Sequence, residues 1–153
     1  ARTFAKAWGM AGLRIGYGIL HPEKIKQIDK YQYPWSVNAL AQAVGAEVVI
    51  DKTFQEKSRS WITDERNFMF QALNSVQSIE VFSSEANFLL FRIRNNNKAI
   101  AHDLYTHLLS QSLLIRNCGN FKGLDENFFR VSVRERKDNQ KLLDSIYDYF
   151  STR

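Results

Sequence analysis

Lys6 is the residue whose neighbours in this chain point most directly to chemistry. It lies in a glycine-rich run from Thr3 to Gly16, with a hydroxyl three positions before it and Arg14 eight positions after it. A lysine amine attacks a carbonyl group only when it is deprotonated, and burial or a neighbouring positive charge favours that form. Arg14 supplies such a charge, and glycines let the backbone pass close to a ligand. The run therefore predicts a nucleophilic lysine beside a bound small molecule.

The same stretch resembles the cofactor-lysine signature of the fold-type I aminotransferase superfamily. In that superfamily the lysine that matches Lys6 carries pyridoxal 5'-phosphate. The resemblance further implies that Arg14 forks onto the cofactor phosphate and that Thr3 donates its hydroxyl to the same group. We therefore expect Thr3, Lys6 and Arg14 to bind the cofactor, with Lys6 as the catalytic residue.

A second set of candidate residues lies on a predicted strand at positions 128–134. Its alternation places Phe129 and Val131 on one face, and Arg130, Ser132 and Arg134 on the other. Arg130 therefore points away from the apolar face. In the superfamily the arginine that Arg130 matches clamps the carboxylate of the amino-acid substrate, so we expect Arg130 to bind substrate.

Three further stretches narrow the resemblance, namely Pro34–Ala41, Ser84–Leu90 and Leu114–Asp125. Together they resemble threonine-phosphate decarboxylases, a family that is similar in sequence to histidinol-phosphate aminotransferases. The counterpart of Arg116 in the aminotransferase branch lies beside the substrate, where it meets a second anionic group. Arg116 is thus the second expected substrate-binding residue. One departure is Lys122, which stands where proline is expected in this family.

The resemblance implies a pyridoxal-phosphate-dependent decarboxylase that acts on L-threonine-O-3-phosphate. Such an enzyme makes aminopropanol phosphate for cobalamin biosynthesis, and the family forms homodimers. Its expected partner is therefore a small phosphorylated amino acid, together with a second copy of the full-length chain. Two alternatives stay open: a histidinol-phosphate or related class I/II aminotransferase, and a non-catalytic binding or dimerisation module.

The resemblance also predicts that the chain is the carboxy-terminal part of a longer enzyme. Family members place a large cofactor-binding region before the lysine, with an acid for the pyridinium nitrogen and an aromatic residue that stacks on the ring. We therefore expect residues 1–52 to be the end of the large domain and residues 53–153 to be the small domain. On this view the chain alone is inactive or nearly so, because these groups position the cofactor.

Hydrophobic periodicity predicts an α+β fold, with helices packed on a small, largely antiparallel sheet. Glu56 follows Thr53 by three positions, the spacing of a capping box at the start of a long helix. The expected strands span residues 12–20, 78–82, 87–93, 113–117 and 128–134, and the expected helices span 22–30, 36–46 and beyond, 53 onward, 97–110 and 138 onward.

Composition excludes several other classes. The net charge of +5 is spread over basic residues interleaved with acids, whereas a nucleic-acid module concentrates its basic residues. No stretch is long and apolar enough to predict a membrane span. The single cysteine, Cys118, forms no internal disulfide, which favours a reducing cytoplasm. The three histidines show no metal-like spacing, so we expect no metal site.

Overall fold

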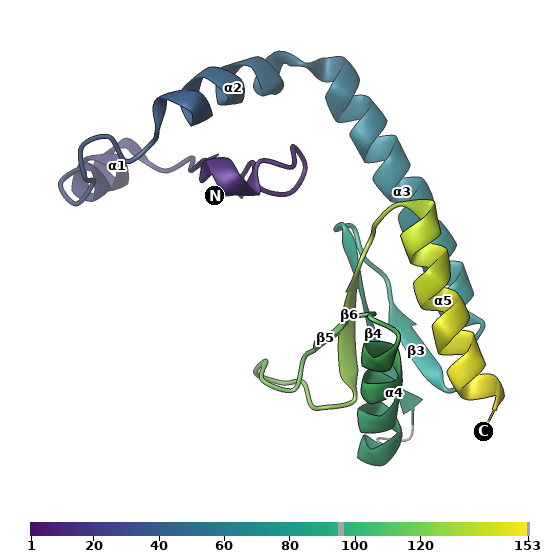
Figure 1. Cartoon of the computed structure of the whole chain (residues 1–153). Helices are drawn as coiled ribbons and strands as arrows, with labels where there is room; N and C mark the ends of the chain where they lie inside the picture. Colours follow the sequence, from purple (N-terminus) through teal and green to yellow (C-terminus); the bar gives the residue numbers. More distant parts are fainter. Residues whose placement is uncertain (95–96, 153) are drawn as a thin grey trace. The chain divides into compact units, whose positions relative to one another are not determined.

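The computed structural model describes residues 1–94 and 97–152 and divides the chain into two compact units. The first unit runs from Ala1 to Arg59, and the second begins at Ser60, inside a long helix. Figure 1 shows both units, coloured along the chain. Among the described residues, none of the helices combines the length and the apolar character needed to cross a membrane.

The first unit begins with a small two-stranded sheet. Strand β1 (Arg2–Thr3) pairs antiparallel with β2 (Gly16–Tyr17), and the 3₁₀ helix η1 (Ala11–Leu13) lies between them. We expected a strand over residues 12–20, and that prediction is wrong except at Gly16–Tyr17. Arg14 has a φ of 53°, a left-handed conformation that no strand contains. In addition, β1 offers only two residues with which β2 can pair.

Two helices complete the first unit. Helix α1 (Pro22–Asp29) has proline in its first turn, where the missing N–H costs nothing. Helix α2 (Ala39–Ile50) begins after Asn38, whose Oδ1 accepts a hydrogen bond from the Ala41 N–H at 2.8 Å. This side-chain cap explains why the helix begins later than the predicted Ser36.

Helix α3 (Lys52–Asn74) follows α2 almost directly. The carboxylate of Asp51 accepts a hydrogen bond from the Phe54 N–H at 2.8 Å and so caps the new helix. The predicted capping box of Thr53 and Glu56 is therefore wrong. Helix α3 begins at Lys52, so Thr53 lies inside it, and Asp51, two positions before Thr53, is the residue that caps the helix.

The second unit contains a four-stranded antiparallel sheet in the order β3-β4-β6-β5. This arrangement confirms the predicted α+β fold. Its strands are short, and β5 at the edge is shorter than the predicted 113–117 because only two of its residues pair with β6. The strands are β3 (Ile79–Phe82), β4 (Phe88–Ile93), β5 (Arg116–Asn117) and β6 (Phe128–Ser132).

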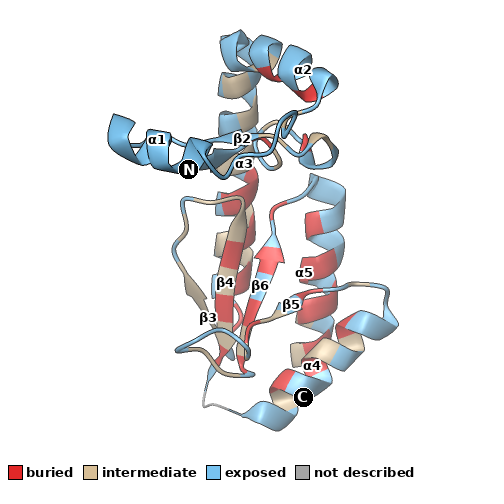
Figure 2. Cartoon of the chain, turned by 90° about the vertical axis from the view of Figure 1, so that its left-hand side faces the viewer, coloured by how far each residue is buried: buried red, intermediate tan, exposed pale blue. Residues whose placement is uncertain are grey.

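Helices α4 (Lys98–Ser110) and α5 (Arg136–Ser151) pack with the later part of α3 on one face of this sheet. The core between them is apolar, and burying one such side chain stabilises the fold by about 1.5–3 kcal/mol. Figure 2 shows the buried positions alternating along β4 and β6. The central core residues are Met69, Leu73, Leu89, Phe91, Leu104, Leu108, Phe129, Val131, Leu143 and Ile146.

The other face of the sheet carries the polar residues that the alternation predicted. Phe129 and Val131 of β6 are buried, whereas Arg130 and Ser132 are exposed. The period of two along β6 therefore places Arg130 outside the core, as expected from the sequence.

Candidate active site

The short β1–β2 sheet positions the three residues predicted to bind a cofactor. Thr3 lies on β1, opposite Gly16 of β2, and the Phe4 N–H extends the ladder by a 3.1 Å bond to the Ile15 carbonyl. Lys6 stands in the turn that follows β1, with an exposed side chain, and its carbonyl accepts a hydrogen bond from the Gly9 N–H at 3.0 Å. One hairpin thus carries Thr3, Lys6 and Arg14.

The side chains of this hairpin have local partners. Thr3 Oγ1 accepts a hydrogen bond from the Ala5 N–H at 3.1 Å, and Arg14 Nη1 donates to the Ala11 carbonyl at 3.0 Å. A hydroxyl and a guanidinium are groups that bind phosphate, and a lysine amine reacts with an aldehyde. The donor set therefore fits pyridoxal phosphate.

Two glycines are required by the shape of the hairpin. Gly9 has a φ of 64°, which glycine adopts without strain. A Cβ atom on Gly16 would lie 2.6 Å from the Arg2 carbonyl oxygen, so any side chain there would push the two strands apart. The pairing that holds Thr3 thus depends on glycine at position 16.

The second unit brings the two predicted substrate-binding arginines together. Arg116 of β5 and Arg130 of β6 are direct cross-strand partners, and both are exposed. Arg116 Nη2 donates to Asn120 Oδ1 at 2.9 Å, and the guanidinium carbon of Arg130 lies 5.1 Å from the centre of the Phe88 ring. Like charges that face each other across a ladder repel, so an anion bound between them would relieve the repulsion.

The two arginines line a cleft of about 780 Å³ along the edge of the sheet. We call it the arginine cleft. Arg134 also lines it and forms an ion pair with Asp138, 3.0 Å from Nε to Oδ2. The sequence pattern placed Arg134 on the same face as Arg130, but we assigned Arg134 no role. The alternation along the strand was the signal that could have placed Arg134 in the same cleft as Arg130. Lining residues that bear charge are Arg116, Arg130, Arg134, Asp138 and Lys141.

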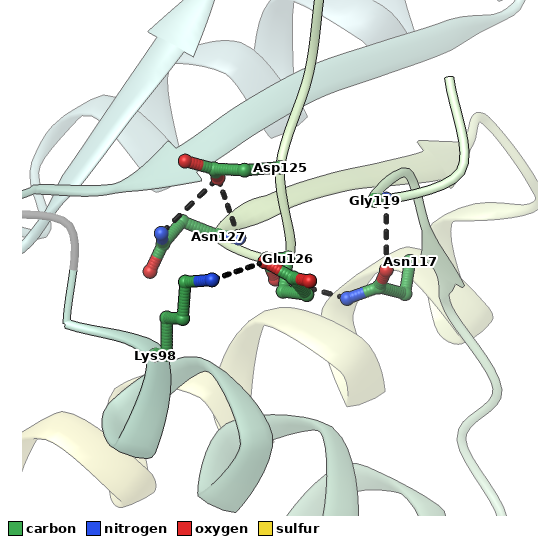
Figure 3. A network of polar contacts seen from close by, with 6 residues as sticks. All are labelled: Lys98, Asn117, Gly119, Asp125, Glu126 and Asn127. Carbon is green, nitrogen blue, oxygen red and sulfur yellow. Dashed lines mark hydrogen bonds and ion pairs between the residues drawn. The ribbon is translucent and has the colours of Figure 1, made fainter. Parts of the chain in front are cut away.

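A polar network shapes the loop that joins β5 to β6 (Figure 3). Asn117 Nδ2 donates to the Glu126 carbonyl at 2.9 Å, and Asn117 Oδ1 accepts from the Gly119 N–H at 2.9 Å. Lys98 Nζ lies 3.0 Å from Glu126 Oε2. Their hydrogen bond raises the pKa of Lys98 and lowers the pKa of Glu126 from their ordinary values. These contacts hold the two ends of the loop together and so fix the position of Arg116.

Cys118 lies between the arginines in sequence and is buried. Burial raises the pKa of its thiol, while the charges of Arg130 and Arg116 oppose that rise. Its Sγ donates to the Arg116 carbonyl at 3.7 Å. We therefore interpret Cys118 as a packing residue beneath the loop.

The sequence model of the family described as aminotransferase class I and II matches residues 1–146. The chain belongs to this family. It is 34% identical over 146 residues to a threonine-phosphate decarboxylase from Salmonella typhimurium, and the match covers 95% of this chain and 39% of that protein.

Solved structures of the family share the fold. A histidinol-phosphate aminotransferase from Clostridium acetobutylicum matches with a TM-score of 0.91 and 34% identity, over 99% of this chain and 45% of that one. An L-threonine-O-3-phosphate decarboxylase from Porphyromonas gingivalis matches with a TM-score of 0.80 and 30% identity, over 97% and 45%. These matches confirm the expected fold of part of a fold-type I enzyme. The chain spans about 39% of the length of the curated relatives it matches.

Proposed function

We propose that the protein containing this chain is a pyridoxal-phosphate-dependent decarboxylase of L-threonine-O-3-phosphate. The observation that carries the proposal is the facing pair of Arg116 and Arg130 at the arginine cleft. O-phosphothreonine bears a carboxylate and a phosphate, and each is an anion that a guanidinium binds through paired hydrogen bonds. One such substrate engages both arginines at once. The product, aminopropanol phosphate, is used in cobalamin biosynthesis.

In this proposal Arg130 binds the substrate carboxylate and Arg116 binds the phosphate. Their two contacts fix the substrate and so decide which bond at its α-carbon breaks. Pyridoxal phosphate, when bound, supplies the electron sink for that bond cleavage. Thr3 and Arg14 bind the cofactor phosphate, and the Lys6 amine anchors the cofactor and delivers a proton to the α-carbon after carbon dioxide leaves.

The alternative is a histidinol-phosphate aminotransferase, and the TM-score of 0.91 to the enzyme from Clostridium acetobutylicum favours it. Histidinol phosphate bears a phosphate but no carboxylate, so its single anionic group would have to meet both arginines. Sequence identity does not separate the two activities, because a relative of each activity is 34% identical to this chain. A non-catalytic binding or dimerisation module is the third reading.

We further propose that the full-length enzyme is a homodimer and that residues 1–153 alone do not turn over substrate. The share of the relatives' length that the chain spans supports the second statement. Assignment of residues 1–52 to a large domain and 53–153 to a small domain belongs to the same proposal. Turnover by the isolated chain would contradict it.

The test is to incubate the full-length protein with pyridoxal phosphate and O-phosphothreonine and to measure carbon dioxide and keto acid. Carbon dioxide without keto acid is the expected result. A parallel reaction with histidinol phosphate and 2-oxoglutarate tests the alternative. Conversion of 2-oxoglutarate to glutamate in that reaction, with no carbon dioxide from O-phosphothreonine, would make the protein an aminotransferase. Absence of both reactions favours the non-catalytic module.

Lys6→Ala provides the matched variant for this test. Loss of the amine should abolish both turnover and the absorption band of the covalently held cofactor. Lys26→Ala removes an exposed lysine of α1 in the same unit and should change neither. A full cofactor band in Lys6→Ala would refute the assignment of the lysine.

A further inference from the structure

Glu65 of α3 is a buried carboxylate whose two oxygens both have partners. Its exposed fraction is 5%. Arg136 Nε donates to Oε1 at 2.8 Å, and Asn139 Nδ2 donates to Oε2 at 2.8 Å. A buried charge is costly, and a well-packed apolar side chain often replaces such a group without loss of stability. The presence of a carboxylate here therefore calls for an explanation other than stability alone.

The partner Asn139 connects Glu65 to the backbone at the end of β6. Asn139 is 2% exposed, and its Oδ1 accepts from the Arg134 N–H at 2.9 Å, while its Nδ2 donates to the Arg134 carbonyl at 2.6 Å. A carboxylate only accepts hydrogen bonds, so it must face the NH₂ of the amide and not its oxygen. Glu65 thereby fixes the orientation in which Asn139 holds Arg134.

Arg134 is the point at which the strand that carries Arg130 leaves the sheet. The adjacent Val133 N–H still bonds to the Asn87 carbonyl at 2.9 Å, whereas the chain turns into α5 from Arg136. Arg134 and Asn139 both line the arginine cleft, and Glu65 does not. The wall of the cleft is thus attached to α3 through Asn139.

Arg136 restrains the same carboxylate from its other side. Its guanidinium carbon lies 3.7 Å from the centre of the Phe68 ring, a cation–π contact that keeps Nε directed at Glu65. Farther along the two helices, Tyr147 Oη donates to the Ala72 carbonyl at 2.6 Å. These two hydrogen bonds hold helix α5 against α3, and the one that Glu65 accepts is the charged one.

We propose that Glu65 is a positioning residue for the arginine cleft, acting through Asn139 on the backbone of Arg134. The proposal rests on the proposed function only in naming the ligand as a phosphorylated amino acid. Glu65 keeps the end of β6 in the direction that aims Arg130 into the cleft. Its role is to order the wall, since Glu65 does not itself line the cleft.

The test compares Glu65→Gln with Glu85→Gln in the full-length protein. Glutamine offers one accepting oxygen where the carboxylate offers two, so a donor then faces either Asn139 or Arg136. The KM for O-phosphothreonine should rise about tenfold, with kcat changed less than about threefold, as expected for loss of one charged hydrogen bond. The Arg134 amide should exchange faster in deuterated water.

The control removes the same charge without touching the cleft wall. Glu85 is fully exposed and lies 3.8 Å from Arg66, so Glu85→Gln should leave both KM and Arg134 exchange unchanged. A lower melting temperature of Glu65→Gln with unchanged KM would overturn the proposal, because the residue would then only stabilise the fold. Unchanged Arg134 exchange would overturn it as well.

A replacement variant and a second readout keep the test of Glu65 decisive. If Glu65→Gln does not fold, Arg136→Gln replaces it, because Arg136 is exposed and its loss leaves the carboxylate without its charged partner. Smaller rises in KM and exchange are then expected, because the hydrogen bond from Asn139 to Glu65 remains and only the restraint of the carboxylate by Arg136 is lost. A protein that turns over no O-phosphothreonine refutes the proposed function, whereas Arg134 exchange still decides the role of Glu65.

Discussion

Arg116 and Arg130 place two permanent positive charges opposite each other on adjacent strands. Such a pair is destabilising in the free protein, because like charges repel across a ladder. Each guanidinium is partly engaged elsewhere, Arg116 with Asn120 and Arg130 over Phe88. A substrate with two anionic groups turns this repulsion into attraction. The charge arrangement is thus better suited to a ligand-bound state than to the free protein.

At the residue scale, the ion pair of Lys98 and Glu126 makes a pH-dependent contribution to stability. The folded-state pKa of Glu126 is lowered, so its contribution is present above the unfolded value, about 4.3, and is lost as pH falls through the folded pKa. The pKa of Lys98 is raised, so its contribution is present below about 10.4 and is lost as pH rises through the folded pKa.

A double-mutant cycle of Lys98→Gln and Glu126→Gln measures that contribution. Coupling between the two residues in thermal unfolding of the chain should be present from about pH 5 to pH 10 and should vanish in more acidic or more alkaline solution. High salt should weaken it, because both groups are exposed. Coupling that persists unchanged at pH 2 would contradict the ion pair.

At the element scale, the β1–β2 hairpin holds the residues proposed to bind the cofactor only while position 16 lacks a side chain. Gly16→Ala puts a Cβ 2.6 Å from the Arg2 carbonyl oxygen and should separate the strands that carry Thr3. The full-length variant should bind pyridoxal phosphate at least about tenfold more weakly, a loss of about 1.4 kcal/mol or more. The measurement is a titration of the cofactor absorption band.

Gly12→Ala is the matched control for this prediction. An added Cβ at Gly12 would meet nothing within 4 Å, so cofactor binding should remain unchanged. An equal loss of cofactor binding in the two variants would contradict the prediction, because the close approach at Gly16 would then not be the cause of the loss.

The elements that the sequence predicted well are those with a strong local period. Strands β4 and β6 and helix α4 lie within one or two residues of the predicted ranges, because alternation and amphipathic spacing reflect one buried face. Arg130 was accordingly placed on the correct face. The prediction of a strand over residues 12–20 was wrong because Arg14 adopts a left-handed conformation. Arginine rarely adopts that conformation, so its residue type gave no signal of it.

The rest of the site depends on contacts between distant positions. Glu65 and Asn139 are 74 residues apart and meet only because α5 packs against α3. Arg116 and Arg130 belong to predicted strands, but their cross-strand register became known only with the β5–β6 ladder. A single sequence shows which residues lie on one face of an element. It does not show which of them face each other across two elements.

At the scale of the whole molecule, the chain belongs to the class I and II aminotransferase family, in which two activities are candidates for it. Both candidate activities use pyridoxal phosphate, and the relatives that carry them are equally identical to this chain. The two proposals differ in the number of anionic groups on the amino substrate, which is two in O-phosphothreonine and one in histidinol phosphate. The decisive variable is therefore the substrate and not the fold.

The most direct measurement is carbon dioxide release from O-phospho-L-threonine and from L-threonine, by the full-length protein and by its Arg116→Gln variant. Loss of a charged hydrogen bond to the phosphate should lower kcat/KM for the phosphorylated substrate by roughly 10–100-fold and leave that for threonine nearly unchanged. Lys122→Gln, an exposed neighbour in the same loop, should alter neither value. Equal losses for both substrates, or no carbon dioxide from either, would contradict a substrate held by its carboxylate and its phosphate at once.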